Sequence, residues 1–130
     1  MISTYTSYTI VNENNTAESM GSGDMPVFAT PAMCALMENA AMNAASIYIK
    51  ESGMESSANT TVGISLNIDH TKATPIGKNI KAVANLTEAE GRKLTFQVTV
   101  YEGDTDEIII GKGTHTRFIV ERERFLGKLK

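Results

Sequence analysis

The sequence is poor in cysteine, in basic charge and in long apolar runs. Cys34 is the one cysteine among 130 residues, so no disulfide can form within the chain and a disulfide-stapled secreted framework is excluded. Lys and Arg total 12 against 15 Asp and Glu, and this net charge of −3 argues against a nucleic-acid partner, which normally requires a basic surface. No stretch offers the ~20 apolar residues that cross a membrane, and the first residues lack the basic and apolar regions of a signal peptide. We therefore expect a cytoplasmic protein with no nucleic-acid or membrane partner.

Several motifs of common cofactor and nucleophile sites are also missing. The chain has no cysteine pair or His/Cys cluster for zinc, no Gly-rich nucleotide loop (GxGxxG or GxxxxGK[ST]) and no GxSxG nucleophile elbow. What is present is an ordinary globular composition, with 42% hydrophobic and 21% charged residues. A chain of this length buries about two-thirds of its unfolded surface. Residues 1–130 are therefore predicted to form a single domain without a metal or a separate cofactor.

One long helix is predicted, from Met33 to about Lys50. Thr30 is a suitable N-cap, and Pro31 would occupy the first helical position. Apolar residues recur with helical spacing, and alanines that favour a helix are frequent. Gly53 follows as a terminator. The many small side chains indicate that other elements pack closely against this helix.

Strands are predicted on both sides of the helix. After it, apolar and polar residues alternate along residues 61–69, 80–87, 94–100 and 107–121, which is the pattern of half-buried strands. Residues 4–11 are a further expected strand, and the polar stretch 12–24 is expected to be a loop. The economical packing of these elements is an α+β fold in which one antiparallel sheet of about five strands wraps around a central helix. Exposed edges of such a sheet predict a homodimer, with a tetramer as a further possibility.

Two ionisable residues fall on faces that these elements should bury. His70 shares the parity of the apolar residues in its strand, so its imidazole should point toward the helix. Those apolar residues are Val62, Ile64, Leu66 and Ile68. Glu38 is an isolated acidic residue within the helix, and because a buried carboxylate normally has a partner, a histidine could supply one. Thr30 precedes Glu38 by eight residues, or ~12 Å along a helix, so a substrate or a third residue could lie between them.

Each of these residues also has a purely structural interpretation. Thr30 could serve only to cap the helix, Glu38 could lie on a solvated outer face, and His70 could be a satisfied core histidine. His115 is either a second ligand-facing group or a structural or surface residue. Cys34 has no basic neighbour along the helix and is predicted to be an inert buried thiol.

A set of motifs is spread from about Pro26 to Leu126. In sequence order they are Val27-Phe28-Ala29-Thr30-Pro31-Ala32-Met33, Leu36-Met37-Glu38, Gly63, His70-Thr71-Lys72-Ala73-Thr74-Pro75, Gly91-Arg92-Lys93-Leu94 and Gly111-Lys112-Gly113-Thr114-His115-Thr116-Arg117. Together they resemble the fluoroacetyl-CoA thioesterase-like family of the hotdog-fold thioesterase superfamily. The resemblance implies a hotdog fold, in which an antiparallel sheet wraps a central helix and dimers share their active sites.

The resemblance also implies the residues of the site. Thr30, Glu38 and His70 match a Thr/Glu/His catalytic set, and Gly63 matches a glycine whose backbone lies near the acyl group of the substrate. The fluoroacetyl-specific enzyme carries a phenylalanine-bearing lid before the helix, whereas residues 17–24 of this chain contain no aromatic side chain. A less specialised thioesterase of the same architecture is therefore expected.

Further residues are predicted to contact the substrate. Phe28 and Met33 would line the site, and the basic residues Lys72, Arg92 and Arg117 would meet the phosphates of CoA, which is part of the substrate and not a cofactor.

The expected reaction is the hydrolysis of an acyl-CoA thioester to a carboxylic acid and CoA. His70 would act as general base, the nucleophile could be Thr30, Glu38 or water, and backbone N–H groups near the helix start or Gly63 would hold the oxyanion. Two alternatives remain. One is an acyl-CoA hydratase or dehydratase, although the adjacent Asp69 and His70 point to opposite faces of a strand. The other is a non-catalytic acyl-CoA-binding module.

Overall fold

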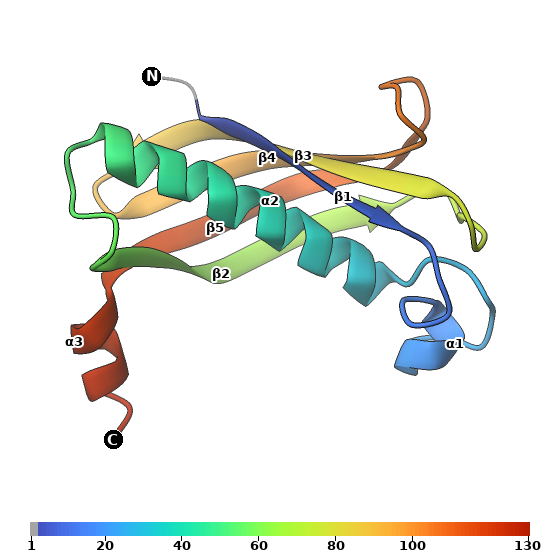
Figure 1. The fold of residues 1–130 in the computed structure, drawn as a ribbon, viewed down its shortest axis with the longest axis horizontal. Coiled ribbons are helices and arrows are strands. Elements are labelled where there is room, and N and C mark those ends of the chain that lie inside the picture. Colours follow the sequence, from blue (N-terminus) through green and yellow to red (C-terminus); the bar gives the residue numbers. More distant parts are fainter. Residues whose placement is uncertain (1–2) are drawn as a thin grey trace.

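One long helix lies across the face of a five-stranded sheet (Figure 1). The computed structural model describes residues 3–130. The order of its elements is β1 (Thr4–Ile10), α1 (Ala17–Met20), α2 (Thr30–Glu51), β2 (Asn59–His70), β3 (Asn79–Glu90), β4 (Lys93–Glu102), β5 (Ile109–Glu121) and α3 (Arg122–Gly127). The predicted α+β architecture, an antiparallel sheet around a central helix, is confirmed. Within residues 3–130, no helix combines the length and the apolarity that a bilayer crossing requires.

The start of α2 differs from the sequence prediction. The helix begins at Thr30, and its N-cap is Ala29, which forms no side-chain capping bond. The prediction of Thr30 as the N-cap was therefore wrong, because the chain enters the helical conformation one residue earlier. The short helix α1 lies inside the stretch expected to be a loop, and α3 follows directly after the last strand, where no helix was expected.

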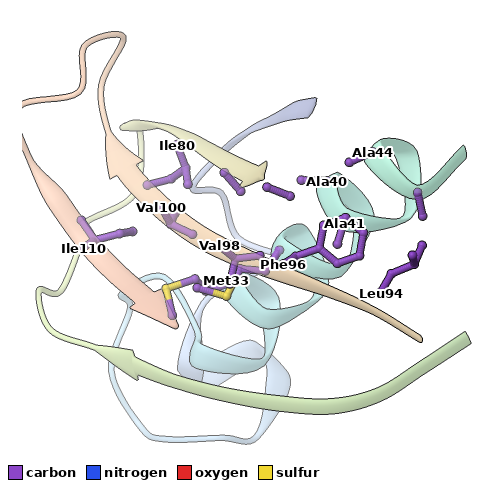
Figure 2. Packing of buried hydrophobic residues seen from close by; sticks show 14 of the residues in the cluster. Met33, Ala40, Ala41, Ala44, Ile80, Leu94, Phe96, Val98, Val100 and Ile110 are labelled. Atoms are coloured by element: carbon purple, nitrogen blue, oxygen red, sulfur yellow. The ribbon is translucent and has the colours of Figure 1, made fainter. Parts of the chain in front are cut away.

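The core lies between α2 and the concave face of the sheet. Four alanines of the helix are fully buried, namely Ala40, Ala41, Ala44 and Ala45. Their small side chains let the helix approach the large residues of β4, of which Leu94 and Phe96 are fully buried (Figure 2). The prediction that other elements pack closely against this helix is therefore confirmed.

The strand order is β1-β3-β4-β5-β2. Strands β3, β4 and β5 are neighbours in chain order, but β2 pairs with β5 and not with β3, the strand that follows it in the sequence. The two edges of the sheet are therefore β1 and β2. Because pairing partners far apart in the sequence leave no local pattern, alternation alone could not place β2 at an edge.

A bulge interrupts β2 between Gly63 and Ser65. The extra residue, Ile64, is 55% exposed, so the prediction that it faces the helix was wrong. Beyond the bulge, Leu66 and Ile68 pack against the core, and His70 lies on the same side. The bulge therefore shifts the inward face by one residue and leaves the predicted orientation of His70 intact.

Candidate active site

Thr30 and His70 meet where α2 begins and β2 ends. The Oγ1 atom of Thr30 lies 2.8 Å from Nδ1 of His70, although the two residues are 40 positions apart in the chain. Because Ala29 caps the helix without a side-chain bond, the Thr30 hydroxyl is not used for capping. The hydroxyl is therefore free to exchange a proton with the imidazole.

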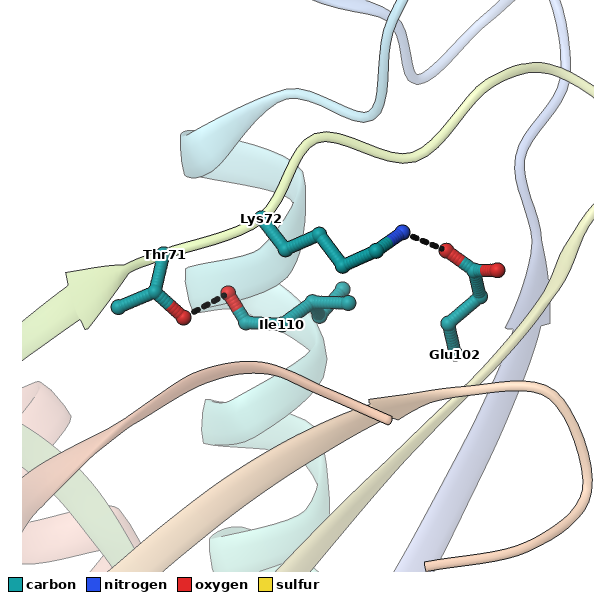
Figure 3. Close-up of polar contacts among 4 residues, drawn as sticks. All are labelled: Thr71, Lys72, Glu102 and Ile110. Atoms are coloured by element: carbon teal, nitrogen blue, oxygen red, sulfur yellow. Dashed lines mark hydrogen bonds and ion pairs between the residues drawn. The ribbon is translucent and has the colours of Figure 1, made fainter. Parts of the chain in front are cut away.

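The chain that follows His70 is fixed by strand β5. The backbone N–H of Thr71 donates to the carbonyl of Ile110 at 2.7 Å, and the Thr71 hydroxyl donates to the same carbonyl at 3.3 Å (Figure 3). One residue further on, Nζ of Lys72 lies 2.8 Å from Oε1 of Glu102. These contacts hold the end of β2, and with it the imidazole, in one place.

The surroundings of His70 favour its neutral form. Burial lowers the pKa of His70 below its ordinary value, and a backbone contact with Lys72 only partly offsets this effect. Phe28 approaches the imidazole edge-on, with ring centroids 6.4 Å apart and planes at 78°. A neutral imidazole can accept a proton, which is the first requirement of a general base.

A pocket of about 250 Å³ opens beside this pair. Its walls include Phe28, Thr30, His70 and Lys72, together with Ala17 and Ser22 from the segment before the helix. The first turn of α2 has no side-chain cap, Pro31 has no N–H, and the N–H of Met33 donates to the carbonyl of Ala29 at 3.0 Å. The N–H groups of Thr30 and Ala32 and the positive end of the helix are therefore available to a developing negative charge. The pocket therefore combines a base, a hydroxyl and potential oxyanion donors.

Glu38 lies in a second crevice, away from this pair. It is half-buried, and it lines a hollow of about 290 Å³ together with Ala35, Asn39, Met42, Gly63 and Arg117. Thr30 precedes Glu38 by eight residues, which corresponds to ~12 Å along the helix axis. The structure therefore brings Thr30 and His70 together within one chain, but it does not bring Glu38 to them.

Gly63 is the point at which Glu38 approaches the sheet. A Cβ atom at this position would lie 2.9 Å from Oε2 of Glu38, 3.2 Å from Cε1 of His115 and 3.3 Å from NH1 of Arg117. Only hydrogen fits there without a shift of these groups. Gly63 thus lets a carboxylate, an imidazole and a guanidinium converge on the backbone of the bulged strand.

Arg117 and His115 form a buried polar cluster behind Gly63. Nε of Arg117 donates to Oγ1 of Thr61 at 2.7 Å, and NH2 donates to the Thr61 carbonyl at 3.0 Å. His115, which the sequence left as either ligand-facing or structural, is 1% exposed and does not line the crevice. A signal for this burial was present, since His115 and Arg117 share the parity of the buried Ile119.

Three other predicted residues lie outside these two crevices or only at their rim. Met33 is fully buried in the core and lines neither crevice. Arg92 lines a separate hollow beside α3. Lys72 lies at the rim of the Thr30 pocket and is paired with Glu102. Burial raises the pKa of the Cys34 thiol, and nearby Glu38 raises it further, which agrees with an inert thiol.

Comparison with known proteins identifies the family. A family model described as fluoroacetyl-CoA-specific thioesterase matches residues 11–123. The chain belongs to this family. Among its relatives, fluoroacetyl-CoA thioesterase from Streptantibioticus cattleyicolor is 38% identical over 104 residues, which is 80% of this chain and 68% of that protein.

Solved structures confirm the hotdog fold. The fluoroacetyl-CoA thioesterase FlK matches with a TM-score of 0.82 at 30% identity, over 97% of this chain and 91% of that chain. A thioesterase superfamily member from Thermus thermophilus matches with a TM-score of 0.78 over 97% of this chain and 87% of that chain, and at 23% identity it supports the fold alone. The predicted family and the predicted fold are therefore confirmed.

Proposed function

We propose that this protein hydrolyses an acyl-CoA thioester with Thr30, His70 and Glu38, and that its active site is completed by a second copy of the chain. Membership of the fluoroacetyl-CoA-specific thioesterase family makes the protein a thioester hydrolase. The assignment of its catalytic residues and of its dimer is our proposal. The observation that carries the proposal is the 2.8 Å contact between the Thr30 hydroxyl and the His70 imidazole.

The chemistry follows from this contact. Nδ1 of His70 takes a proton from the Thr30 hydroxyl, or from a water molecule that the hydroxyl holds, and the resulting oxygen nucleophile attacks the thioester carbonyl. N–H groups of the first turn of α2 stabilise the oxyanion. When the C–S bond breaks, the thiolate of CoA takes the proton from the His70 imidazolium. If Thr30 is the nucleophile, a water molecule deprotonated by His70 then cleaves the acyl ester on Thr30, and by either route the products are a carboxylic acid and free CoA. Each step uses only side chains, backbone and water, so no metal or separate cofactor is required.

Glu38 requires a further argument, because it lies ~12 Å from Thr30 along α2. Strand β2 is an edge of the sheet, 12 residues long, and Gly63, Ile64 and Ser65 are exposed along it. An unpaired edge of this length is a template for a strand from another molecule. A second copy that pairs antiparallel along β2 would extend the sheet across the interface.

One register of this pairing would unite the two crevices. If the two-fold axis lies midway between Gly63 and His70, each Gly63 faces His70 of the partner subunit. Glu38 lies beside Gly63, so its carboxylate would then enter the Thr30–His70 site of the other copy. Two equivalent sites would form, each with Thr30 and His70 from one subunit and Glu38 from the other. The expected tetramer and a cytoplasmic location remain predictions.

The protein is proposed to be less specialised for its acyl group than a fluoroacetyl-specific enzyme. The relatives named above are described as fluoroacetyl-CoA thioesterases. In this chain the segment that precedes α2 carries no aromatic residue between Ala17 and Asp24. Lys72 at the rim of the Thr30 pocket and Arg117 in the wall of the Glu38 crevice are proposed to meet the phosphates of CoA, whereas Arg92 lies in a separate hollow and is left out of this proposal. The broader proposal is therefore a small or medium acyl-CoA as substrate.

The catalytic residues are tested with a panel of acyl-CoA substrates that includes acetyl-CoA and fluoroacetyl-CoA, with release of the CoA thiol measured by a chromogenic reagent. We expect His70→Ala to lower kcat by ~10²–10⁴-fold, the usual range for loss of a general base. Thr30→Val removes the hydroxyl and keeps the volume, whereas Thr30→Ser keeps the hydroxyl and should retain most of the activity. Thr114→Val, on the exposed surface of β5, is the control. Equal turnover by wild type and His70→Ala would refute the assignment.

The dimer is tested with two matched substitutions. Ile64 on β2 and Ile10 on β1 are 55% and 52% exposed, so each can be changed to Asp without disturbing the core. Ile64→Asp should place like charges across a β2 interface, dissociate the dimer in analytical ultracentrifugation and reduce activity in parallel. Ile10→Asp should do neither. If Ile10→Asp gives the monomer instead, the interface lies at β1 and the proposed sharing of Glu38 is wrong.

Calorimetry separates this enzyme from a binding module. A non-catalytic acyl-CoA-binding protein would bind CoA esters tightly and release no thiol. Turnover that disappears in His70→Ala while binding persists supports the enzyme.

A further inference from the structure

We propose that His115 is a positioning residue, which fixes the guanidinium of Arg117 beside Glu38 in the crevice at Gly63. The inference rests on the proposed function, because Glu38 and Arg117 are assigned there to the catalytic and substrate-binding groups. His115 itself lies behind the crevice. It is 1% exposed and does not line the hollow formed by Glu38, Gly63 and Arg117, so it cannot touch a substrate held there.

The two ring nitrogens of His115 have partners of opposite character. Nδ1 lies 2.8 Å from the carbonyl oxygen of Ser65, which can only accept, so Nδ1 carries a proton and donates it. Nε2 lies 3.2 Å from NH1 of Arg117, which can only donate, so Nε2 offers its lone pair. These two contacts assign the neutral tautomer protonated at Nδ1. Burial and the charge of Arg117 both lower the pKa of His115, in agreement with a neutral ring.

The guanidinium of Arg117 is thereby held at three corners. Nε and NH2 are held by the side chain and the carbonyl of Thr61 on β2, and NH1 is held by His115 on β5. Thr61 alone would fix one edge of the planar group and leave NH1 without a protein acceptor. A buried cation with an unsatisfied donor is costly, so the group would shift to find another partner.

A displaced NH1 would meet the carboxylate of Glu38, because both groups converge on Gly63. Burial lowers the pKa of Arg117, and the charge of nearby Glu38 opposes this effect, yet no ion pair within 4.0 Å joins the two among the described residues. His115 therefore occupies the donor that would otherwise move onto the carboxylate. The carboxylate stays available at the crevice, and the guanidinium keeps a fixed place in its wall. His115 thus separates two opposite charges that would close the crevice by pairing with each other.

The groups that face His115 come from three elements. Arg117 lies on its own strand, the Ser65 carbonyl lies on β2, and the charge of Glu38 on α2 acts on it from the crevice side. On β4, its register partner is the apolar Phe96. If the ring is replaced, the carboxylate of Glu38 is therefore the acceptor among these groups that remains for NH1 of Arg117.

The test compares two substitutions at position 115 with a change at Arg117. His115→Phe preserves the ring and removes both hydrogen-bonding atoms. His115→Gln supplies an amide that can donate to Ser65 and accept from Arg117. We expect His115→Phe to lower kcat/KM by about tenfold, the order expected from the loss of a hydrogen bond to a charged group. His115→Gln should restore most of the loss.

A double-mutant cycle separates positioning from mere support of the fold. If His115 acts through Arg117, the double variant His115→Phe/Arg117→Met should be no slower than Arg117→Met alone. If His115 only fills space, the two losses in kcat/KM should multiply. Thermal unfolding of each variant shows which fraction is folded at the assay temperature. Multiplying losses, or a folded His115→Phe with wild-type kcat/KM, would overturn the proposal.

A spectroscopic readout keeps this test independent of activity. The chain has two histidines, so His70→Asn leaves His115 as the one imidazole in a ¹⁵N NMR spectrum. We expect the pattern of a neutral ring protonated at Nδ1, and slowed exchange of the Arg117 side-chain N–H groups that His115→Phe abolishes. A ring protonated at Nε2 near neutral pH would refute the proposal. A wild-type protein without thioesterase activity but with this spectrum would instead refute the proposed function.

Discussion

Substitution of Gly63 by alanine tests whether the crevice beside Glu38 takes part in the reaction. The added Cβ would lie 2.9 Å from Oε2 of Glu38, whereas ordinary contacts of a Cβ atom begin near 3.4 Å, so the carboxylate must retreat by about 0.5 Å. The added Cβ cannot move away from Glu38 without cost, because it would also lie 3.2 Å from Cε1 of His115 and 3.3 Å from NH1 of Arg117. Because these three contacts are the ends of side chains and not backbone, the strand itself can stay in place.

The expected cost falls on the rate and not on the fold. A misplacement of 1 Å in an active site can cost ~10²-fold in rate, so a shift of half that size should lower kcat/KM by about tenfold, or ~1.4 kcal/mol of transition-state stabilisation. Gly63 has no positive φ, so alanine is compatible with its backbone. Replacing such a glycine reduces the entropy of the unfolded chain by ~0.4–1 kcal/mol, which offsets part of the steric strain.

The assay measures kcat/KM with the preferred acyl-CoA and the midpoint of urea unfolding for the same preparation. Gly127→Ala is the control, because a Cβ at that position meets nothing within 4 Å. We expect Gly63→Ala to lose activity with a midpoint close to that of wild type, and the control to change neither. Wild-type kcat/KM in a folded Gly63→Ala protein would show that the arrangement of Glu38 at Gly63 does not matter for catalysis.

Three further predictions concern pH, the core and the surface. Burial lowers the pKa of both His70 and His115 below 6.5, so below pH 6.5 the unfolded chain binds more protons than the folded protein. The contribution of these histidines to the free energy of unfolding should therefore be complete above pH 6.5 and fall as the pH drops below it. Equal midpoints of urea unfolding at pH 7.5 and 5.5 would contradict this. Phe96→Ala, at a fully buried position, should cost ~3–5 kcal/mol in urea unfolding. Phe125→Ala, at a position that is 36% exposed, should cost much less. Lys72→Ala should lower the free energy of unfolding by less than ~1 kcal/mol, because the ion pair between Lys72 and Glu102 is partly exposed. The same substitution should raise KM for acyl-CoA more than Lys78→Ala does. Equal KM values for the two variants would show that Lys72 is not part of the CoA site.

The periodicity of the chain was sufficient to predict the helix and the strands, but not every boundary. The N-cap of α2 could not be found, because Ala29 caps without a side chain and Thr30 carries the side chain that normally signals a cap. The bulge in β2 was hidden for a related reason. Val62 and Ile64 are both apolar, so the alternation continues in the sequence through the point at which the backbone breaks it.

The candidate site was predictable in part. The parity of His70 with Leu66 and Ile68 placed its ring on the inner face, and the contact with Thr30 depends on the way α2 crosses the sheet, which no local pattern encodes. The burial of His115 and Arg117 was signalled only by their parity with Ile119, and polar side chains normally indicate a solvated face. Their burial depends on mutual hydrogen bonds and on Thr61 from another strand, and these become visible only in three dimensions.

The residues that lead into α2 are held by main-chain bonds. The N–H of Ala29 donates to the carbonyl of Asn15, and the N–H of Phe28 donates to that of Thr74, at 2.9 Å each. These backbone hydrogen bonds are retained in most substituted chains, because they do not depend on the side chains. The side chains of the segment before the helix, some of which line the Thr30 pocket, can therefore change while the Thr30 hydroxyl stays within reach of the His70 imidazole.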